Sequence, residues 1–390
     1  MKDLTGFTLT PMQQKAINIC LKNFQKNKTT VIAGYAGTGK STIVRFLIDK
    51  LVKNGLIKES EIIFSAFTGK AAQVLTNKDC PALTLHKLMY EAKVDDWGEV
   101  TFELKEELPY KLVVVDECSM VPIDMVDELK SFGIPLVFLG DPGQLPPIQE
   151  DSANKLLDHP DIFLTEVLRQ ALDSPIIRLS MKIRNGEFIG DFNYPEAKVI
   201  TKKELTAEDL RSADMILVGT NNARKRINKA MRAFLKKTGV IDEGEKLICT
   251  QNYWDALIET SLTNGTVGTL HKWTDSEKTY FKGSLRIKTF RGEFITEGGL
   301  QKTIHIDKRF LIDEVSSMTF RQEMKIKPRI NQPLKLTYAY AITGHKAQGS
   351  EWDNVIVFEE DFPYGEDHTK WLYTCVTRAR KKVIIVRGRI

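Results

Sequence analysis

The stretch GYAGTGKS at residues 34–41 decides the fold. It follows the apolar run TTVIAG and opens a helical pattern from Ser41, which is the strand, loop and helix context of a phosphate-binding P-loop. Glycines let backbone N–H groups cradle phosphates, Lys40 neutralises the terminal phosphates, and the Ser41 hydroxyl ligates Mg²⁺. The stretch predicts ATP and Mg²⁺ as cofactors; a glycine-rich turn without a ligand is the alternative. The predicted nucleotide-binding residues here are Gly34, Ala36, Gly37, Thr38, Gly39, Lys40, Ser41 and Thr42.

A second apolar strand, residues 112–115, ends in the acidic pair Asp116-Glu117. The carboxyl ends of parallel strands meet at one edge of a sheet, so the pair is expected beside the P-loop. Asp116 is expected to hold Mg²⁺ with Ser41, and Glu117 to orient and deprotonate the attacking water. Gln144, in the segment GDPGQLPP at 140–147, is expected to touch the γ-phosphate. An ordinary Pro/Gly turn is the alternative for that segment.

Apolar runs alternate with helical patterns over residues 31–140, which is typical of a parallel α/β sheet. A second series follows, with DMILVG at 214–219, DNVIVF at 353–358 and KKVIIV at 381–386. The predicted fold class is therefore α/β, with two lobes that each hold a parallel sheet flanked by helices.

Two stretches break this alternation. Residues 89–109 are acidic and alternating, with a turn near Trp97-Gly98, and predict a projecting hairpin. Residues 269–331 are polar, strand-like and interrupted by glycines, and predict a small β-barrel. The expected domains are 1–88 with 110–168 as the first lobe, 89–109 as the hairpin, 169–268 with 332–390 as the second lobe, and 269–331 as the β insertion.

Composition narrows the class of protein. A chain of 390 residues exceeds the usual size of one hydrophobic core, and 42% hydrophobic with 27% charged residues is the balance of a soluble globular protein. The net charge of +5 favours a polyanionic partner. Five separated cysteines without a CxxC pair indicate reduced thiols rather than a zinc site. The sequence contains no run of eighteen apolar residues, so we expect a cytoplasmic protein with no membrane contact.

Phosphoryl transfer needs positive charge beyond Mg²⁺ and the P-loop lysine, and an arginine from a facing surface supplies it. Arg169 in LTEVLRQ and Arg378 in LYTCVTRARKK are the two candidates. A surface arginine in a salt bridge is the alternative for either.

The order of motifs resembles superfamily 1B helicases, the 5′-to-3′ branch with RecD-like and phage Dda-like proteins. The resemblance covers nearly the whole chain. It rests on LTPMQQKAI at 9–17, the P-loop, SAFTGKAA at 65–72, LTLHKL at 83–88, VVVDECSM at 113–120, GDPGQLPP, LTEVLRQ at 164–170, GTNNARKRIN at 219–228, NGTVG at 264–268, AYAITGHKAQGSEWD at 339–353 and YTCVTRA at 373–379.

The resemblance implies two RecA-like lobes, a pin at 89–109 and an SH3-like module at 269–331. It also implies that Gln13 reads the adenine, and that Arg169 and Arg378 reach the γ-phosphate across the lobe interface. Gln348, Gly349 and Glu351 resemble the family's coupling motif at the nucleotide. Phe67 departs from the pattern, because the family often carries proline there.

A DNA-binding face is expected where loops leave the carboxyl ends of the strands in both lobes. Phe67 is expected to stack on a base, with a core phenylalanine as the alternative. His86 is either a DNA contact or a satisfied core histidine. Trp97 at the hairpin tip is expected to wedge the duplex open. The predicted DNA-binding residues are Phe67, Thr68, Lys70, Thr84, His86, Trp97, Asn221, Arg224, Thr343, His345 and Lys346.

The predicted function is an ATP-dependent DNA helicase, moving 5′ to 3′ on single-stranded DNA and opening forked or tailed duplex as a monomer. The direction comes from the resemblance alone. An RNA helicase of the same superfamily and a nucleotide-switched DNA-binding ATPase without unwinding are the alternatives. A small-molecule kinase is disfavoured, because it does not need GDPGQLPP or AITGHKAQGSE.

Overall fold

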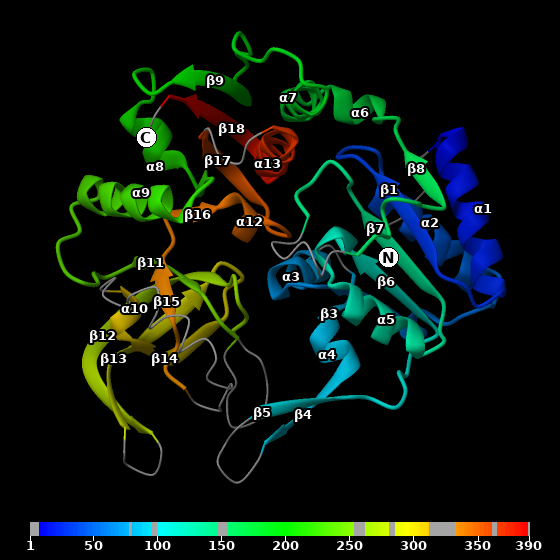
Figure 1. Ribbon diagram of the computed structural model, residues 1–390, viewed down its shortest axis with the longest axis horizontal. Coiled ribbons are helices and arrows are strands. Elements are labelled where there is room, and N and C mark those ends of the chain that lie inside the picture. The colour runs from blue at the N-terminus through cyan, green and yellow to red at the C-terminus, as the bar shows by residue number, and fades with distance from the viewer. Residues whose placement is uncertain are drawn as a thin grey trace.

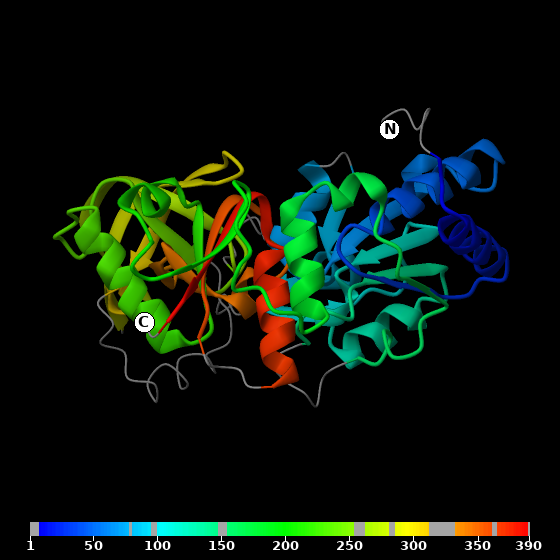
Figure 2. The ribbon, with the colours of Figure 1, turned by 90° about the horizontal axis from the view of Figure 1, so that it is seen from above.

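The computed structural model describes residues 8–77, 80–94, 100–146, 154–252, 262–280, 285–311, 332–360 and 365–388. The amino-terminal half forms one lobe and the carboxyl-terminal half forms a second, with an antiparallel sheet attached to the second lobe (Figure 1). Seen from above, α13 stands at the junction of the two lobes (Figure 2).

The first lobe is built on a six-stranded parallel sheet in the order β3-β2-β6-β7-β1-β8. Its central strands are buried on both faces, which explains their continuous apolar runs. Alternate residues point to opposite faces, so Val114 packs toward α1 and α2 while Val113 and Val115 pack toward α4 and α5. The strands are β1 (Thr30–Gly34), β2 (Ile62–Ala66), β3 (Ala82–Thr84), β6 (Leu112–Asp116), β7 (Leu136–Gly140) and β8 (Ile162–Leu164), and the helices are α1 (Pro11–Gln25), α2 (Lys40–Lys53), α3 (Gly69–Asn77), α4 (Leu85–Met89), α5 (Ile123–Ser131) and α6 (Arg169–Leu172).

The second lobe holds a five-stranded parallel sheet in the order β16-β10-β17-β18-β9. The prediction of two lobes with parallel sheets is therefore confirmed. Its strands are β9 (Ala197–Thr201), β10 (Met215–Val218), β16 (Ala341–Thr343), β17 (Trp352–Phe358) and β18 (Ala379–Arg387), and its helices are α7 (Pro175–Arg184), α8 (Ala207–Ser212), α9 (Asn221–Phe234), α12 (Gly344–Ala347) and α13 (Glu366–Val376).

The antiparallel sheet is larger than the predicted β insertion at 269–331. Its order is β14-β13-β12-β11-β15, and both β11 (Glu245–Cys249) and β15 (Leu336–Tyr338) lie outside that range. These two short strands pack their apolar residues into the same core as β12 (Val267–Tyr280), β13 (Leu285–Thr296), β14 (Gln301–Asp307) and the short α10 (Lys308–Leu311). The predicted bounds were wrong because β11 and β15 resemble buried strands of the adjoining lobe.

A hairpin projects from the first lobe after α4 (Figure 1). It pairs β4 (Tyr90–Val94) with β5 (Val100–Leu104) in antiparallel register, so that Tyr90 faces Leu104. Both strands fall within the predicted range 89–109. Trp97 lies outside the described residues.

No helix within the described ranges is both long and apolar enough to cross a membrane.

Candidate functional site

The P-loop leaves β1 and enters α2 through two residues in left-handed conformation, Gly37 (φ 79°) and Gly39 (φ 82°). The loop turns tightly: a Cβ built on Gly34 would lie 2.7 Å from Thr38 Oγ1. Lys40 Nζ donates to the carbonyl oxygens of Gly34 (2.6 Å) and Tyr35 (3.1 Å). The ammonium group therefore lies over the loop whose backbone N–H groups are expected to hold phosphates.

Gln13 supports the loop from α1. Thr10 and Gln13 form a capping box: Thr10 Oγ1 accepts from Gln13 N (3.2 Å) and Gln13 Oε1 accepts from Thr10 N (3.0 Å). Gln13 Nε2 also donates to the carbonyl oxygen of Thr38 (3.2 Å), and the residue is 3% exposed. Its amide thus lies against the P-loop, and its predicted contact with adenine stays a prediction.

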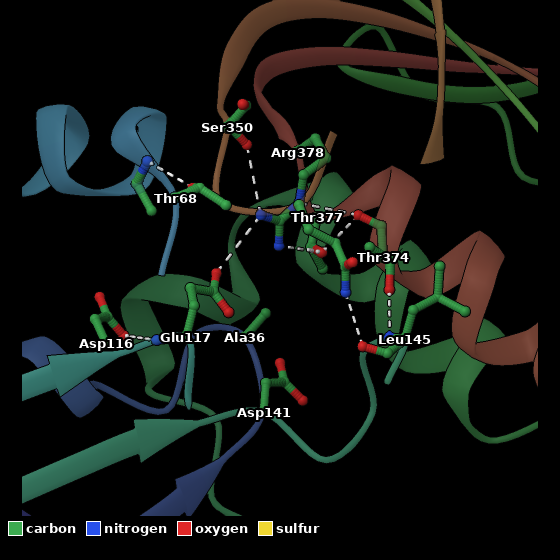
Figure 3. A network of polar contacts seen from close by, with 12 residues as sticks. Ala36, Thr68, Asp116, Glu117, Asp141, Leu145, Ser350, Thr374, Thr377 and Arg378 are labelled. Atoms are coloured by element: carbon green, nitrogen blue, oxygen red, sulfur yellow. Dashed lines mark hydrogen bonds and ion pairs between the residues drawn. The ribbon is translucent and has the colours of Figure 1, made fainter. Parts of the chain in front are cut away.

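The acidic pair follows β6 at the same sheet edge. Glu117 has a left-handed backbone (φ 52°), an unusual conformation for this residue type, and its N–H donates to Asp116 Oδ1 (2.9 Å). The turn directs the two carboxylates away from the strand axis in Figure 3. Both line a small cavity of about 60 Å³ that Ser41 also lines. A serine hydroxyl and an aspartate side by side fit the oxygen ligands that Mg²⁺ prefers.

Arg378 enters this site from the second lobe. It begins the turn after α13, is 4% exposed, and its guanidinium lies 3.5 Å from Glu117 Oε1 (Figure 3). Nε donates to the Thr374 carbonyl (3.1 Å), and a terminal nitrogen donates to Thr377 Oγ1 (3.2 Å). These bonds aim the charged group at the acidic pair. The cavity is also lined by Gly349 and Glu351, so residues of both lobes form it.

Arg169 begins α6, and the preceding Leu168 donates its backbone N–H to the Gly37 carbonyl (3.0 Å). The backbone of residue 169 is therefore beside the P-loop, while its side chain lies outside the described part of the chain. Gln144 is buried in the turn after β7. Gln348 does not line the nucleotide cavity; its Nε2 donates to the Leu145 carbonyl in the turn after β7 (2.7 Å).

A second cavity, of about 830 Å³, opens between the lobes and the antiparallel sheet. It gathers residues from the carboxyl ends of β2, β3 and β16, as expected for a binding face at that sheet edge. Nine predicted DNA-binding residues line it: Phe67, Thr68, Lys70, Thr84, His86, Asn221, Thr343, His345 and Lys346.

Two predicted members of this face are placed differently. Arg224 is not among the lining residues; its Nε donates to Asn221 Oδ1 (3.2 Å), and its charge acts on the nearby Lys346. Lys70 lines the cavity, but its ammonium pairs with Glu297 of the antiparallel sheet (2.8 Å). Phe67 lines the cavity and also packs against the lobe core, and its stacking on a base stays a prediction.

Burial lowers the pKa of three basic side chains that line this cavity. It lowers the pKa of His86 and of His345, so both imidazoles favour the neutral form. Burial, reinforced by the positive charge of Arg224, lowers the pKa of Lys346 to about 8. The cavity therefore presents neutral imidazoles and one lysine that titrates near physiological pH.

Several lining residues were missed by sequence reasoning. Lys87, Tyr90, Phe102 and Lys105 come from the base of the hairpin. Lys105 Nζ donates to the carbonyls of Lys87 (3.0 Å) and Leu88 (2.8 Å), which closes the hairpin onto α4. Lys87 lies in the motif LTLHKL and the other three lie within the predicted hairpin, so these basic and aromatic residues were a usable signal. Met120, Asn252, Thr263, Asn264, Gly265, Gln348 and Ser350 are further lining residues not predicted there.

Over the ranges that the structure describes, no group of three or more His, Cys, Asp or Glu residues could hold a metal ion. The predicted Mg²⁺ ligands Ser41 and Asp116 line one cavity, where phosphate oxygens and water would complete the ligand set.

Comparison with known proteins matches the two lobes to two family models. Residues 8–200 match an AAA domain, and residues 338–386 match a UvrD-like helicase C-terminal domain. The chain is 32% identical over 200 residues to the ATP-dependent DNA helicase dda of Enterobacteria phage T4, which covers 47% of the chain and 44% of that protein. It is 27% identical over 383 residues to the ATP-dependent RecD2 DNA helicase of Deinococcus radiodurans, which covers 91% of the chain and 46% of that protein.

The chain thus spans less than half the length of either curated relative. Its fold is similar to that of the Bacteroides Pif1 helicase solved with ADP-AlF3 and single-stranded DNA, with a TM-score of 0.57 and 18% identity over 98% of the chain and 93% of that structure. The two family models and these relatives together make the chain similar to ATP-dependent DNA helicases over both lobes.

Proposed function

We propose that the protein is an ATP-driven motor that moves 5′ to 3′ along single-stranded DNA and separates the duplex ahead of it. One observation carries the proposal: both cavities lie between the same two lobes. The smaller is lined by Ser41, Glu117 and Arg378, and the larger by the nine predicted DNA-binding residues. A change in the distance between the lobes would therefore alter both at once.

ATP hydrolysis follows from the residues of the smaller cavity. Lys40 and the P-loop N–H groups bind the phosphates, and Glu117 orients and deprotonates the attacking water. Ser41 and Asp116 would hold Mg²⁺, which would supply positive charge beside the phosphates when bound. Arg378 lies 3.5 Å from Glu117, so a γ-phosphate that enters the cleft meets a cation from the opposite lobe. Hydrolysis removes that attraction and favours lobe opening.

Movement follows when opening and closing alternate the grip on the strand. Gln348 lines the larger cavity and bonds to the turn after β7, so it is a suitable link between nucleotide state and DNA grip. The direction is supported by the resemblance to Dda-like and RecD-like proteins. The proposal further includes action as a monomer on tailed or forked duplex DNA inside the cell. Trp97, which the sequence predicts at the turn of the hairpin, would assist strand separation.

The test is ATP hydrolysis with Mg²⁺, measured with and without single-stranded DNA. We expect stimulation by DNA, and we expect Lys40→Ala to reduce the rate by about 10²-fold or more, because it removes a cation from the developing phosphate charge. Chelation of Mg²⁺ should have an equal effect. Equal hydrolysis with and without DNA would contradict the motor. Stronger stimulation by an RNA strand of matched sequence would favour an RNA helicase, since the nucleic acids differ at the 2′-OH.

A further inference from the structure

Tyr373 extends from α13 of the second lobe into the first lobe. Its hydroxyl accepts the N–H of Ala36, the third residue of the P-loop stretch, at 2.8 Å, and donates to Asp141 Oδ2 at 2.7 Å. The residue is 1% exposed. A single hydroxyl therefore joins three parts of the molecule: the P-loop, the turn after β7 and the last helix.

The Asp141 carboxylate is held by hydrogen bonds at both of its oxygens. The carboxylate is buried, and the other oxygen, Oδ1, accepts the N–H of Gly143 at 2.9 Å. A Cβ built on Gly143 would lie 3.1 Å from the Tyr373 ring, so the ring packs directly on the turn. Burial raises the pKa of Asp141, and the hydrogen bonds from Tyr373 and Gly143 act in the opposite direction by stabilising the carboxylate. Loss of the tyrosine hydroxyl would leave a buried acceptor and a buried N–H without their partner.

Two further contacts fasten the same turn to the second lobe. Thr374, the next residue of α13, accepts the N–H of Leu145 at its hydroxyl (3.0 Å), and Gln348 Nε2 donates to the Leu145 carbonyl (2.7 Å). Figure 3 shows the Thr374 contact near Arg378, which lies in the turn that follows α13. Both ends of the 141–145 turn are thus held from the second lobe, and the Tyr373 hydroxyl joins this turn to the P-loop.

We propose that Tyr373 is a positioning residue for ATP hydrolysis. When the lobes close, its hydroxyl fixes the P-loop at Ala36 and the turn at Asp141, so that the nucleotide site takes its reactive shape only in the closed state. The contact requires both lobes, and it is lost when they separate. This inference rests on the proposed function, because it concerns the same ATP site.

The test is Tyr373→Phe, which keeps the ring that packs on Gly143 and removes only the hydroxyl. Steady-state ATP hydrolysis at saturating single-stranded DNA should show kcat lowered about tenfold, with KM for ATP changed by less than about twofold, because the contact forms after ATP has bound and the lobes close. Asp141→Asn keeps the shape of the partner and weakens the same bond. It should lower kcat about threefold, and the double variant should be no slower than about tenfold below wild type, since both changes remove one interaction.

Tyr340→Phe is the matched control. Tyr340 also donates from a half-buried hydroxyl to a carboxylate, Glu245 Oε1 at 2.9 Å, but within the second lobe and away from the P-loop. Tyr340→Phe should lower Tm to about the same degree as Tyr373→Phe but leave kcat unchanged. A Tyr373→Phe enzyme with wild-type kcat, or with a raised KM and unchanged kcat, would overturn the inference, as would additive effects in the double variant. An inactive wild-type protein would instead contradict the proposed function.

Discussion

Burial sets the charge of single basic residues in the larger cavity. Lys346 is among its lining residues, and burial together with the charge of Arg224 lowers its pKa to about 8. The ordinary pKa of a lysine is about 10.4, so an exposed lysine stays charged throughout the physiological range. Lys346 is instead charged below pH 8 and increasingly neutral above it. A phosphate contact favours the charged form, so DNA binding must take up a proton once the pH exceeds 8.

Affinity for single-stranded DNA should therefore fall as the pH rises. Between pH 7 and pH 9, at constant salt, we expect the Kd to increase about tenfold, because roughly one molecule in ten keeps the Lys346 charge at pH 9. Fluorescence anisotropy with a labelled oligonucleotide measures this. Lys346→Arg is the control, since arginine stays charged, and it should flatten the profile. A profile equally steep in Lys346→Arg would assign the titration to another group and contradict the contact.

Residues of the nucleotide site could be predicted where the signal lies in one short stretch of sequence, such as a loop or an acidic pair that directly follows an apolar strand. The P-loop, Asp116 and Glu117 lie at strand ends that the sequence itself marks, and the structure brings Ser41, Asp116 and Glu117 into one cavity. Tyr373 and Glu297 could not be found in this way, because their partners lie in another lobe. A tyrosine in an apolar helix and a glutamate in a polar turn carry no local sign of such contacts.

Among the elements, the turn between β13 and β14 connects the antiparallel sheet to both lobes. Glu297 in this turn pairs with Lys70 of α3 (2.8 Å) and accepts from Trp352 Nε1 of β17 (3.1 Å). The turn lies close to the first lobe: a Cβ built on Gly298 would lie 2.0 Å from Gln73 Nε2. Because Lys70 also lines the larger cavity, the Glu297 contact closes one side of the predicted DNA path.

Glu297→Gln should loosen this closure. The variant keeps an acceptor for Trp352 but loses the charge pair with Lys70, whose side chain is only 12% exposed. A pair at this depth is worth about 1 kcal/mol, so bound single-stranded DNA should dissociate about fivefold faster in stopped-flow measurements. Glu293→Gln, on β13 just before this turn, is the control: the partner of Glu293, Lys272, is largely exposed, and loss of this ion pair should change the rate little. Equal rates for the two variants would exclude Glu297 from the closure.

The limits of element prediction have a physical cause. Period and composition predicted the central parallel strands of both lobes, which are buried on both faces and appear in the sequence as continuous apolar runs. The short strands β3, β8 and β16 and the edge strand β9 were not predicted. The same reasoning misjudged the antiparallel sheet. β11 and β15 are short, buried and apolar. Their sequences therefore do not show whether they pair in the antiparallel sheet or in the parallel sheet of the second lobe.

At the scale of the whole molecule, the interface between the lobes joins the two cavities. Arg378 and Glu117 meet at the nucleotide side, Tyr373 and Thr374 hold the turn after β7, and Gln348 joins that turn to the larger cavity. Each contact requires the lobes to be closed. A motor needs this coupling, because binding energy at one cavity must change the geometry of the other.

Unwinding of a duplex that carries a single-stranded tail at either its 5′ or its 3′ end tests the motor most directly. With ATP and Mg²⁺, the proposed function predicts that wild-type protein separates the 5′-tailed duplex and leaves the 3′-tailed duplex intact, and that Lys40→Ala separates neither. Opening from the 3′ tail alone would contradict the direction. DNA-stimulated hydrolysis with both duplexes intact would contradict unwinding itself.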